Sequence, residues 1–274
     1  MPSPATTFKK SALALGLCLS LTALADGQDQ GGPGGPGGPG EEGASWGLGI
    51  FAMMNQKPYL DIDAQVIAIP AIQFENQYLR VFGPGIEFKL PSLTLTDSQQ
   101  LNFGLLAQYD FGGYDAKEAK KTPILNGMEK RSGGFWAGAK AEWQNDIANL
   151  SVEWTQDITG DSEGARVKVG LERTWMIGQH VMLMPRVVGI WQDENYNNYM
   201  YGVRAAEARV GRPEFITEAG INTELGLRAI YMFDMQHSLF LDVSATNLAT
   251  EIQDSPLVDS STETGVLFGY VYRF

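Results

Sequence analysis

Hydrophobic and polar residues alternate along most of the chain between residues 46 and 274. In the segment 147–158, for example, apolar and polar side chains fall on opposite faces of an extended chain. The apolar face carries Leu150, Val152 and Trp154, and the polar face carries Ser151, Glu153 and Thr155. A period of two residues is typical of β-strands, and no helical period of 3.6 residues persists beyond a few turns. The pattern predicts an all-β fold.

The alternating segments predict about twelve strands. They lie at 46–55, 64–73, 76–82, 85–91, 101–110, 133–145, 147–156, 164–176, 179–192, 217–233, 236–247 and 263–274. Strands of about ten residues suit tilted crossings of a membrane, whereas strands of soluble sandwiches usually have about five or six residues. We therefore expect a transmembrane antiparallel up-and-down β-barrel over residues 46–274, with an even number of strands.

The region 76–100 leaves the strand number open. Gly83-Pro84-Gly85 predicts either a hairpin or a kink within one strand, so ten strands is the alternative to twelve. With twelve strands, both termini and the short turns near 146, 177–178 and 234–236 lie on the periplasmic side. The longer connections then lie on the outer side, as bacterial barrels prefer, at 111–132, 157–163, 193–216 and 248–262.

The polar faces of the predicted strands carry charges of both signs. These residues are Lys140, Glu142, Glu153, Arg166, Lys168, Glu172, Arg186, Glu224, Arg228 and Asp242. Such groups could not pack in a sandwich core without a large desolvation cost, but they can line a wet or ion-paired lumen. A soluble barrel with this face outward is the alternative. The segment 181–191 is apolar on both faces apart from Arg186, so only its neighbours orient it.

Aromatic residues also follow a barrel pattern. The last segment, 265–274, has one apolar face that we expect to contact lipid, formed by Val266, Phe268, Tyr270, Tyr272 and Phe274. A final Phe preceded by an alternating aromatic residue resembles the signal that the barrel-assembly machinery recognises. We therefore predict an assembly signal at Phe268, Tyr270, Tyr272 and Phe274. Other aromatic residues close to strand ends predict an interfacial girdle, namely Trp143, Trp154, Trp175, Trp191 and Tyr231.

Residues 1–25 have the features of a secretory signal peptide. Two lysines precede the apolar run 12–24, which is shorter than the roughly 20 residues that a membrane-spanning helix needs. A small-x-small cleavage site follows at Ala23 and Ala25. Residues 26–45 then predict a Gly/Pro-rich periplasmic leader, because this stretch has almost no apolar side chain to bury. The barrel domain, 46–274, completes the chain.

Charge and composition disfavour several classes of partner and activity. Without the two signal-peptide lysines, 18 of the 20 basic residues remain against 32 acidic ones, a net charge of −14 that disfavours nucleic acid as a partner. The one cysteine, Cys18, lies in the signal peptide, and the two histidines, His180 and His237, are more than 50 residues apart beside predicted periplasmic turns. We therefore predict no metal site, no cofactor and no catalytic pair. An outer-leaflet lipid hydrolase that uses a histidine is the less favoured alternative.

Three stretches of the chain carry a resemblance to a known family. They are Tyr199-Met200-Tyr201-Gly202-Val203 with Glu207-Ala208 after it, Phe82-Gly83-Pro84-Gly85, and Ile252-Gln253-Asp254-Ser255-Pro256-Leu257-Val258. In order and spacing they resemble the MipA/OmpV outer-membrane proteins, also called MltA-interacting proteins. The resemblance covers nearly the whole mature chain, and the Gly-Gly-Pro leader departs from it.

This resemblance implies a location in the cell outer membrane and a non-enzymatic role. It implies a scaffold that brings a murein lytic transglycosylase together with a murein-synthesising penicillin-binding protein. Outer-membrane lipid and the barrel-assembly machinery would be further partners. A small channel or a surface adhesin is the alternative function, and the resemblance assigns no binding residue.

Overall fold

The computed structural model describes residues 44–62 and 64–274, without the side chain of Gln65. The predicted signal peptide, its cleavage positions Ala23 and Ala25, and nearly all of the predicted leader lie outside the described residues. These expectations therefore stay predictions.

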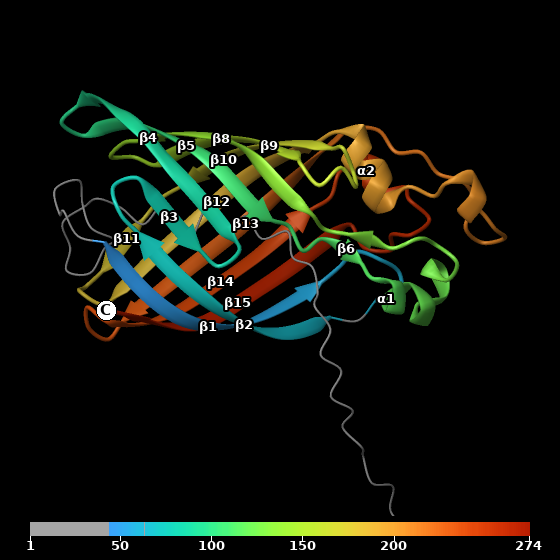
Figure 1. The fold of residues 1–274 in the computed structure, drawn as a ribbon, viewed down its shortest axis with the longest axis horizontal. Coiled ribbons are helices and arrows are strands. Elements are labelled where there is room, and N and C mark those ends of the chain that lie inside the picture. Colours follow the sequence, from blue (N-terminus) through green and yellow to red (C-terminus); the bar gives the residue numbers. More distant parts are fainter. Residues whose placement is uncertain (1–43, 63) are drawn as a thin grey trace, which may run out of the picture.

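Within the described residues, twelve antiparallel strands form a closed barrel (Figure 1). The strands are β1 (Ser45–Gln56), β2 (Gln65–Glu75), β3 (Leu79–Phe82), β4 (Gly85–Thr96), β5 (Gln99–Tyr109), β8 (Phe135–Gln144), β9 (Asn149–Asp157), β10 (Ala165–Glu172), β12 (Val181–Gln192), β13 (Gly220–Met232), β14 (His237–Asn247) and β15 (Thr262–Arg273). The barrel closes because β1 pairs with β15 and β10 pairs with β12. The short β11 (Trp175–Ile177) also pairs with β12, so it continues the line of β10.

The hairpin between β3 and β4 settles the number of strands. Phe82 lies opposite Gly85, and Gly83 has a positive φ of 53°, a conformation that glycine adopts without strain. Gly83-Pro84 is therefore a turn between two strands, and the ten-strand alternative is wrong.

The limits that we predicted for β4 and β5 are also wrong. β4 runs to Thr96 rather than to residue 91, and β5 begins at Gln99 rather than at residue 101. The pairing register shifts between Leu90 and Leu93, which indicates a β-bulge. A bulge inserts an extra residue and breaks the period of two, so this part of β4 looked like a loop in the sequence.

The predicted lipid-facing and lumen-facing sides of the strands are confirmed. On β9, Leu150, Val152 and Trp154 are exposed, whereas Glu153 and Thr155 are buried. The apolar face of β15 also lies outside: Phe268 is 50% exposed, and its inward neighbours Leu267 and Val271 are buried. The role of this face in barrel assembly stays a prediction.

The outer connections fold into short elements that the alternation does not show. They are β6 (Gly113–Tyr114), α1 (Ala116–Lys121), η2 (Pro123–Leu125), β7 (Arg131–Ser132), α2 (Glu194–Tyr201), η3 (Ala205–Glu207) and α3 (Thr250–Gln253). Asp115 and Glu118 begin α1 with a capping box, in which each side chain accepts a hydrogen bond from the other's backbone N–H. These elements gather at the barrel end opposite the carboxyl terminus (Figure 1), and we call them the cap. Among the described helices, none has the length and apolar character to cross a membrane.

A β-hairpin projects from the other end of the barrel, which we expect to face the periplasm. β3 pairs with β4 only over Gly85–Phe88, and β5 pairs with β8 from Gln100 onward. The residues between these limits, 90–99, form the end of the β4–β5 hairpin, which extends away from the barrel wall (Figure 1). Every residue from Leu90 to Ser98 is exposed. We call residues 90–99 the periplasmic hairpin.

Candidate functional site: the capped mouth and the packed lumen

The cap has a hydrophobic core of its own. Its buried members come from four outer connections and from the ends of the adjoining strands, and Leu125, Ile252 and Leu257 have no exposed surface. The whole cluster comprises Tyr59, Ile62, Tyr114, Ala119, Leu125, Met128, Trp136, Tyr196, Met200, Tyr201, Val203, Leu248, Ala249, Ile252 and Leu257. Burial of this many apolar side chains holds the outer connections together as one folded layer.

The first of the three stretches that resemble the family (family-like stretches), 199–203, joins separate connections of the cap. The Tyr199 hydroxyl accepts a hydrogen bond from the Ser132 backbone N–H at 3.0 Å and lies 3.1 Å from the Ser132 carbonyl, to which it donates. The Tyr59 hydroxyl donates to the Met200 carbonyl at 3.1 Å. These bonds tie α2 to β7 and to the connection that follows β1.

The family-like stretch 252–258 packs beside the first. The Ser255 hydroxyl donates to the Tyr201 carbonyl at 2.6 Å, and Val258 forms an isolated β-bridge with Tyr59. Asp254-Ser255-Pro256 forms a turn that directly follows α3. Two of the three family-like stretches therefore meet in the cap, and the third, 82–85, forms the β3–β4 turn in the barrel wall.

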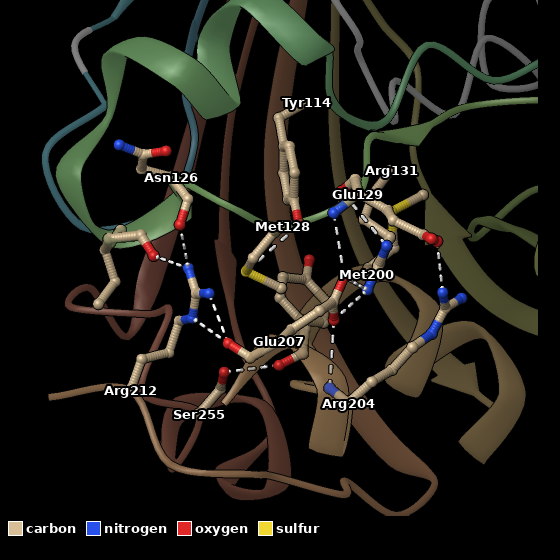
Figure 2. Close-up of polar contacts among 12 residues, drawn as sticks. Tyr114, Asn126, Met128, Glu129, Arg131, Met200, Arg204, Glu207, Arg212 and Ser255 are labelled. Carbon is tan, nitrogen blue, oxygen red and sulfur yellow. Dashed lines mark hydrogen bonds and ion pairs between the residues drawn. The ribbon is translucent and has the colours of Figure 1, made fainter. Parts of the chain in front are cut away.

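A buried carboxylate, Glu207, lies at the centre of the polar contacts in the cap (Figure 2). It accepts hydrogen bonds from the Arg131 guanidinium at 2.7 and 2.9 Å. It also accepts from the backbone N–H groups of Glu129 at 3.0 Å and Arg204 at 3.2 Å. Arg131 is 1% exposed and Glu207 is 6% exposed, so this ion pair is shielded from water. It joins η3 to β7 across 76 residues of sequence.

Arg212 is a second buried cation that holds the cap together through backbone carbonyls. Its guanidinium donates to the Glu207 carbonyl, to the Ile124 carbonyl and, at 3.1 Å, to the Asn126 carbonyl (Figure 2). The chain around Arg212 is thereby attached to η2. Burial lowers the pKa of Arg212, and the neighbouring charge of Arg209 lowers it further.

The surroundings of the cap's ionisable groups shift their pKa values in opposite directions. Burial would raise the pKa of Glu207, but the N–H groups of Glu129 and Arg204 and the guanidinium of Arg131 outweigh it, so the pKa lies below its ordinary 4.5. Burial raises the pKa of Tyr114, whose hydroxyl lies 3.7 Å from the Met128 sulfur. Glu207 is therefore held as a carboxylate and Tyr114 as a neutral phenol.

Lys57 connects the cap to the barrel. It follows the last residue of β1, and its ammonium group donates to the Gly113 carbonyl and lies 3.4 Å from the Glu118 carboxylate. Burial lowers the pKa of Lys57, and Glu118 opposes that effect. Beneath the cap is a cavity of about 50 Å³ whose lining includes Lys57, Glu224 and Ser244. Its volume suits a few water molecules.

Ion pairs fill one side of the lumen. Arg186 on β12 contacts Glu224 on β13 at 2.8 Å and Asp242 on β14 at 2.8 Å, and Arg228 contacts Asp242 at 3.1 Å. Gly226 makes room for the Arg186 guanidinium, since a Cβ atom there would lie 2.4 Å from its Cζ atom. Further buried pairs join Lys168 to Glu153, Lys140 to Glu142, and Arg166 to Asp110. The predicted lumen charges are therefore inside, and they neutralise one another.

Apolar side chains fill the lumen beside these ion pairs. Phe51 on β1 packs edge to face against Phe82 and against Phe240, with ring centroids 5.7 Å apart in both pairs. The ring of Phe51 lies over Gly269, where a Cβ atom would be only 2.2 Å away. Phe51 and Phe240 are 3% and 6% exposed. Side chains that line a water-filled channel would be more exposed, so the barrel is packed at this level.

The two histidines take part in contacts at the periplasmic rim. The Nδ1 atom of His180 is 2.8 Å from the Met232 carbonyl, and His237 contacts the Tyr270 hydroxyl. His180 lies in the turn before β12 and His237 is the first residue of β14, so each lies beside a different turn, as predicted. Sequence reasoning missed Arg131 and Arg212, because most of their partners are backbone carbonyls or residues more than 70 positions away, which leave no local pattern.

An antiparallel closed barrel with an apolar outer face and a charged, ion-paired interior is a transmembrane barrel of the bacterial outer-membrane type. Residues 48–274 match the family model described as MltA-interacting protein MipA. The chain therefore belongs to the MipA family, and it is an outer-membrane protein.

Two relatives show the range of the family. The outer membrane protein OmpV of Vibrio cholerae serotype O1 is 26% identical over 170 residues, covering 62% of this chain and 65% of OmpV. The chain thus spans slightly under two thirds of that relative. The MltA-interacting protein of Escherichia coli K12 is 24% identical over 233 residues, covering 83% of this chain and 89% of that protein. An outer membrane channel from Pseudomonas putida F1 is distantly similar in structure, with a TM-score of 0.43, 14% identity, and coverage of 87% of this chain and 100% of that chain.

Proposed function

We propose that the protein is a non-enzymatic scaffold of the outer membrane. It brings a murein lytic transglycosylase together with a murein-synthesising penicillin-binding protein at the periplasmic face. Family membership supports this proposal, and so does the name of the relative from Escherichia coli, MltA-interacting protein.

The closed lumen is the observation that carries the proposal. The cap covers the outer mouth, and the rings of Phe51 and Phe240 together with the Arg186 ion pairs pack the interior. A solute would have to displace paired charges from a buried site, which costs several kcal/mol for each ion left without a partner. A barrel closed in this way offers its rims rather than its interior for function. Murein lies on the periplasmic side, so the periplasmic rim is the surface that faces these partners.

The periplasmic hairpin is the part of that rim best placed for contact. Leu93 and Leu95 are 55% and 52% exposed, and no charged residue occurs between Lys89 and Asp97. Among the described residues, the strand edge beyond Lys89 has no neighbour on the β3 side. Open strand edges are sites where another chain can add a strand, and they are not tolerated in the hydrocarbon region of a membrane. The hairpin therefore extends into the periplasm, where the partner enzyme contacts it.

A pull-down experiment with the full mature protein tests this function. The protein is extracted in detergent from outer membranes, and co-purified proteins are assayed for murein lytic transglycosylase activity and for penicillin binding. We expect both activities with the unaltered protein. The double change Leu93→Ser and Leu95→Ser should reduce the recovered transglycosylase activity, because it removes exposed apolar contacts from the hairpin.

The matched control is Ile147→Ser, in the β8–β9 turn of the same rim. Ile147 is 76% exposed, so this change removes a comparable apolar surface outside the hairpin. Folding of each variant is checked by its heat-modifiable migration in gels. Recovery of barrel-assembly factors alone from the unaltered protein would contradict the scaffold function. Equal loss of transglycosylase from the control and the hairpin variant would contradict the role of the hairpin.

A surface adhesin is the second candidate function, and the tip of the cap favours it. Val210 is fully exposed in the turn between Arg209 and Arg212, and Ile216 is 74% exposed nearby. A rigid outer layer that presents apolar side chains can bind a host or cell-surface protein. Whole-cell adhesion measured with Val210→Ser cells tests it, and adhesion equal to that of unaltered cells would count against this function.

A further inference from the structure

Three lysines share one exposed face of α1. Lys117, Lys120 and Lys121 occupy positions i, i+3 and i+4, which lie on the same side of a helix. All three are exposed, whereas Glu118 and Ala119 between them are buried against the cap. The helix therefore separates a buried face from a basic face.

The charge of this basic face is not neutralised nearby. Among the described residues, none of the three lysines forms an ion pair. The closest acidic residues along the chain are otherwise engaged: Glu118 faces Lys57, and the carboxylate of Asp115 accepts the N–H groups at the start of α1. Three positive charges within two turns of helix create a strong positive potential at this surface, although the chain as a whole has a net charge of −12.

A fourth cation lies beside α1. The Arg209 guanidinium donates to the carbonyls of Pro123 and Ile124 in η2, directly after the helix. This contact holds the exposed Arg209 close to the carboxyl-terminal end of α1. The four cations, Lys117, Lys120, Lys121 and Arg209, form what we call the basic face of the cap.

α1, which carries the lysines of the basic face, lies beyond the outer end of β1 (Figure 1). Lys57 follows directly after β1, and its contacts with Gly113 and Glu118 hold α1 at the outer end of that strand. The lipid-facing residue closest to this end of β1 is Met54, which is 43% exposed. The outer ends of barrel strands meet the headgroup region, so the Lys57 contacts hold α1 close to the lipid headgroups of the outer leaflet.

We infer that the basic face of the cap binds the phosphate groups of phosphorylated glycolipid in the outer leaflet. The charge complementarity is direct, because lysine ammonium and arginine guanidinium groups bind phosphate oxygens through charge-assisted hydrogen bonds. The fixed cap makes this a site rather than a mobile tail, since the capping box and the Lys57 contacts hold α1 in place. The site lies on the opposite side of the membrane from the proposed scaffold contact and is independent of it.

Native mass spectrometry of the mature protein in detergent tests this inference. The probe is purified bis-phosphorylated lipid A, compared with lipid A from which both phosphates have been removed. The variant changes the three lysines together, Lys117→Gln, Lys120→Gln and Lys121→Gln. A basic residue near an anionic lipid surface typically strengthens binding about fivefold, so the triple variant should retain lipid A on the order of a hundredfold more weakly.

Two control variants show whether a loss of binding comes from the positive charge of the basic face or from another effect of the substitutions. The triple change of the same lysines to arginine keeps the charge and should retain lipid A as the unaltered protein does. Arg173→Gln removes one exposed cation at the periplasmic end and should leave retention unchanged. Equal retention of dephosphorylated lipid A would overturn the inference, because the acyl chains alone would then explain binding. Retention by the glutamine variant equal to that of the unaltered protein would also overturn it.

Discussion

Replacing Glu207 by Gln tests whether one buried carboxylate holds the cap closed. Glu207 accepts two hydrogen bonds from Arg131 and one each from the backbone N–H groups of Glu129 and Arg204. The change keeps the size of the side chain but removes its charge. One carboxylate oxygen is also replaced by an NH₂ group, which donates and cannot accept from these partners.

The expected loss is large because the partner cation is buried. Arg131 is 1% exposed, so without the carboxylate its charge stays in the cap without compensation. Breaking a buried ion pair from one side typically costs roughly 3–5 kcal/mol. Opening of the cap should therefore become easier by a factor between about a hundred and several thousand. The barrel strands carry their own hydrogen bonds, so we expect them to stay folded.

Acid should produce the same opening in the unaltered protein. The pKa of Glu207 in the folded cap lies below its ordinary 4.5, because backbone N–H groups and Arg131 favour the charged form. In the opened cap the carboxylate takes up a proton at about pH 4.5, whereas in the closed cap it does so only at lower pH. The stabilisation from Glu207 is thus complete above about pH 4.5. It is lost as the pH falls below this value and through the lower pKa of Glu207 in the closed cap. Glu207→Gln should not show this contribution.

Hydrogen exchange measured by mass spectrometry follows the opening directly. We expect faster exchange in 111–132 and 193–219 for Glu207→Gln, with exchange in the barrel strands unchanged. Glu129→Gln is the matched control, because Glu129 pairs with Arg204 at the surface and such exposed pairs contribute about 0.2–1 kcal/mol. If Glu207→Gln and Glu129→Gln exchanged alike in these regions, the reasoning about the buried pair would be refuted.

Three further outcomes follow from the barrel itself. Deleting Phe274 should reduce the heat-modifiable barrel in outer-membrane fractions while export and signal cleavage continue, and unchanged amounts of barrel would contradict its role in assembly. Gly269→Ala should destabilise the barrel by about 1–3 kcal/mol in chemical denaturation, since the new Cβ atom would meet the ring of Phe51, and Phe51→Leu in the same chain should recover part of that loss. Purified protein in planar lipid bilayers should give no steady conductance, because Phe240 and Arg186 are buried within the lumen, and reproducible channel currents would show that the packed lumen opens.

The barrel could be predicted from the sequence because the alternation of apolar and polar residues is visible within each short segment of the chain. Most strands show their lipid face through alternate apolar residues, as Leu150 and Val152 do on β9, and the lumen charges follow from the same alternation. The rule failed where the chain departs from it, at the bulge between Leu90 and Leu93. There the extra residue moved the alternation out of phase and hid the end of β4.

The cap could not be predicted in this way, because its order comes from contacts between distant segments. Arg131 meets Glu207 76 positions away, and Arg212 meets Ile124 88 positions away. Neither residue belongs to a periodic pattern or to a recognisable motif of charges. The short helices α1 and α2 are also too brief for a helical period to stand out against the surrounding loops.

The stretches that carry the family resemblance and the contacts that close the outer mouth are largely the same. Tyr201 and Ser255 lie in two of these stretches and are hydrogen-bonded to each other, and Glu207 follows the first stretch and joins η3 to β7. A motif that built a solute-binding site would direct its polar side chains into the lumen, but these residues direct theirs into the interior of the cap. In this chain these stretches therefore maintain a closed outer layer, which supports the proposal that the protein acts through its exposed rims.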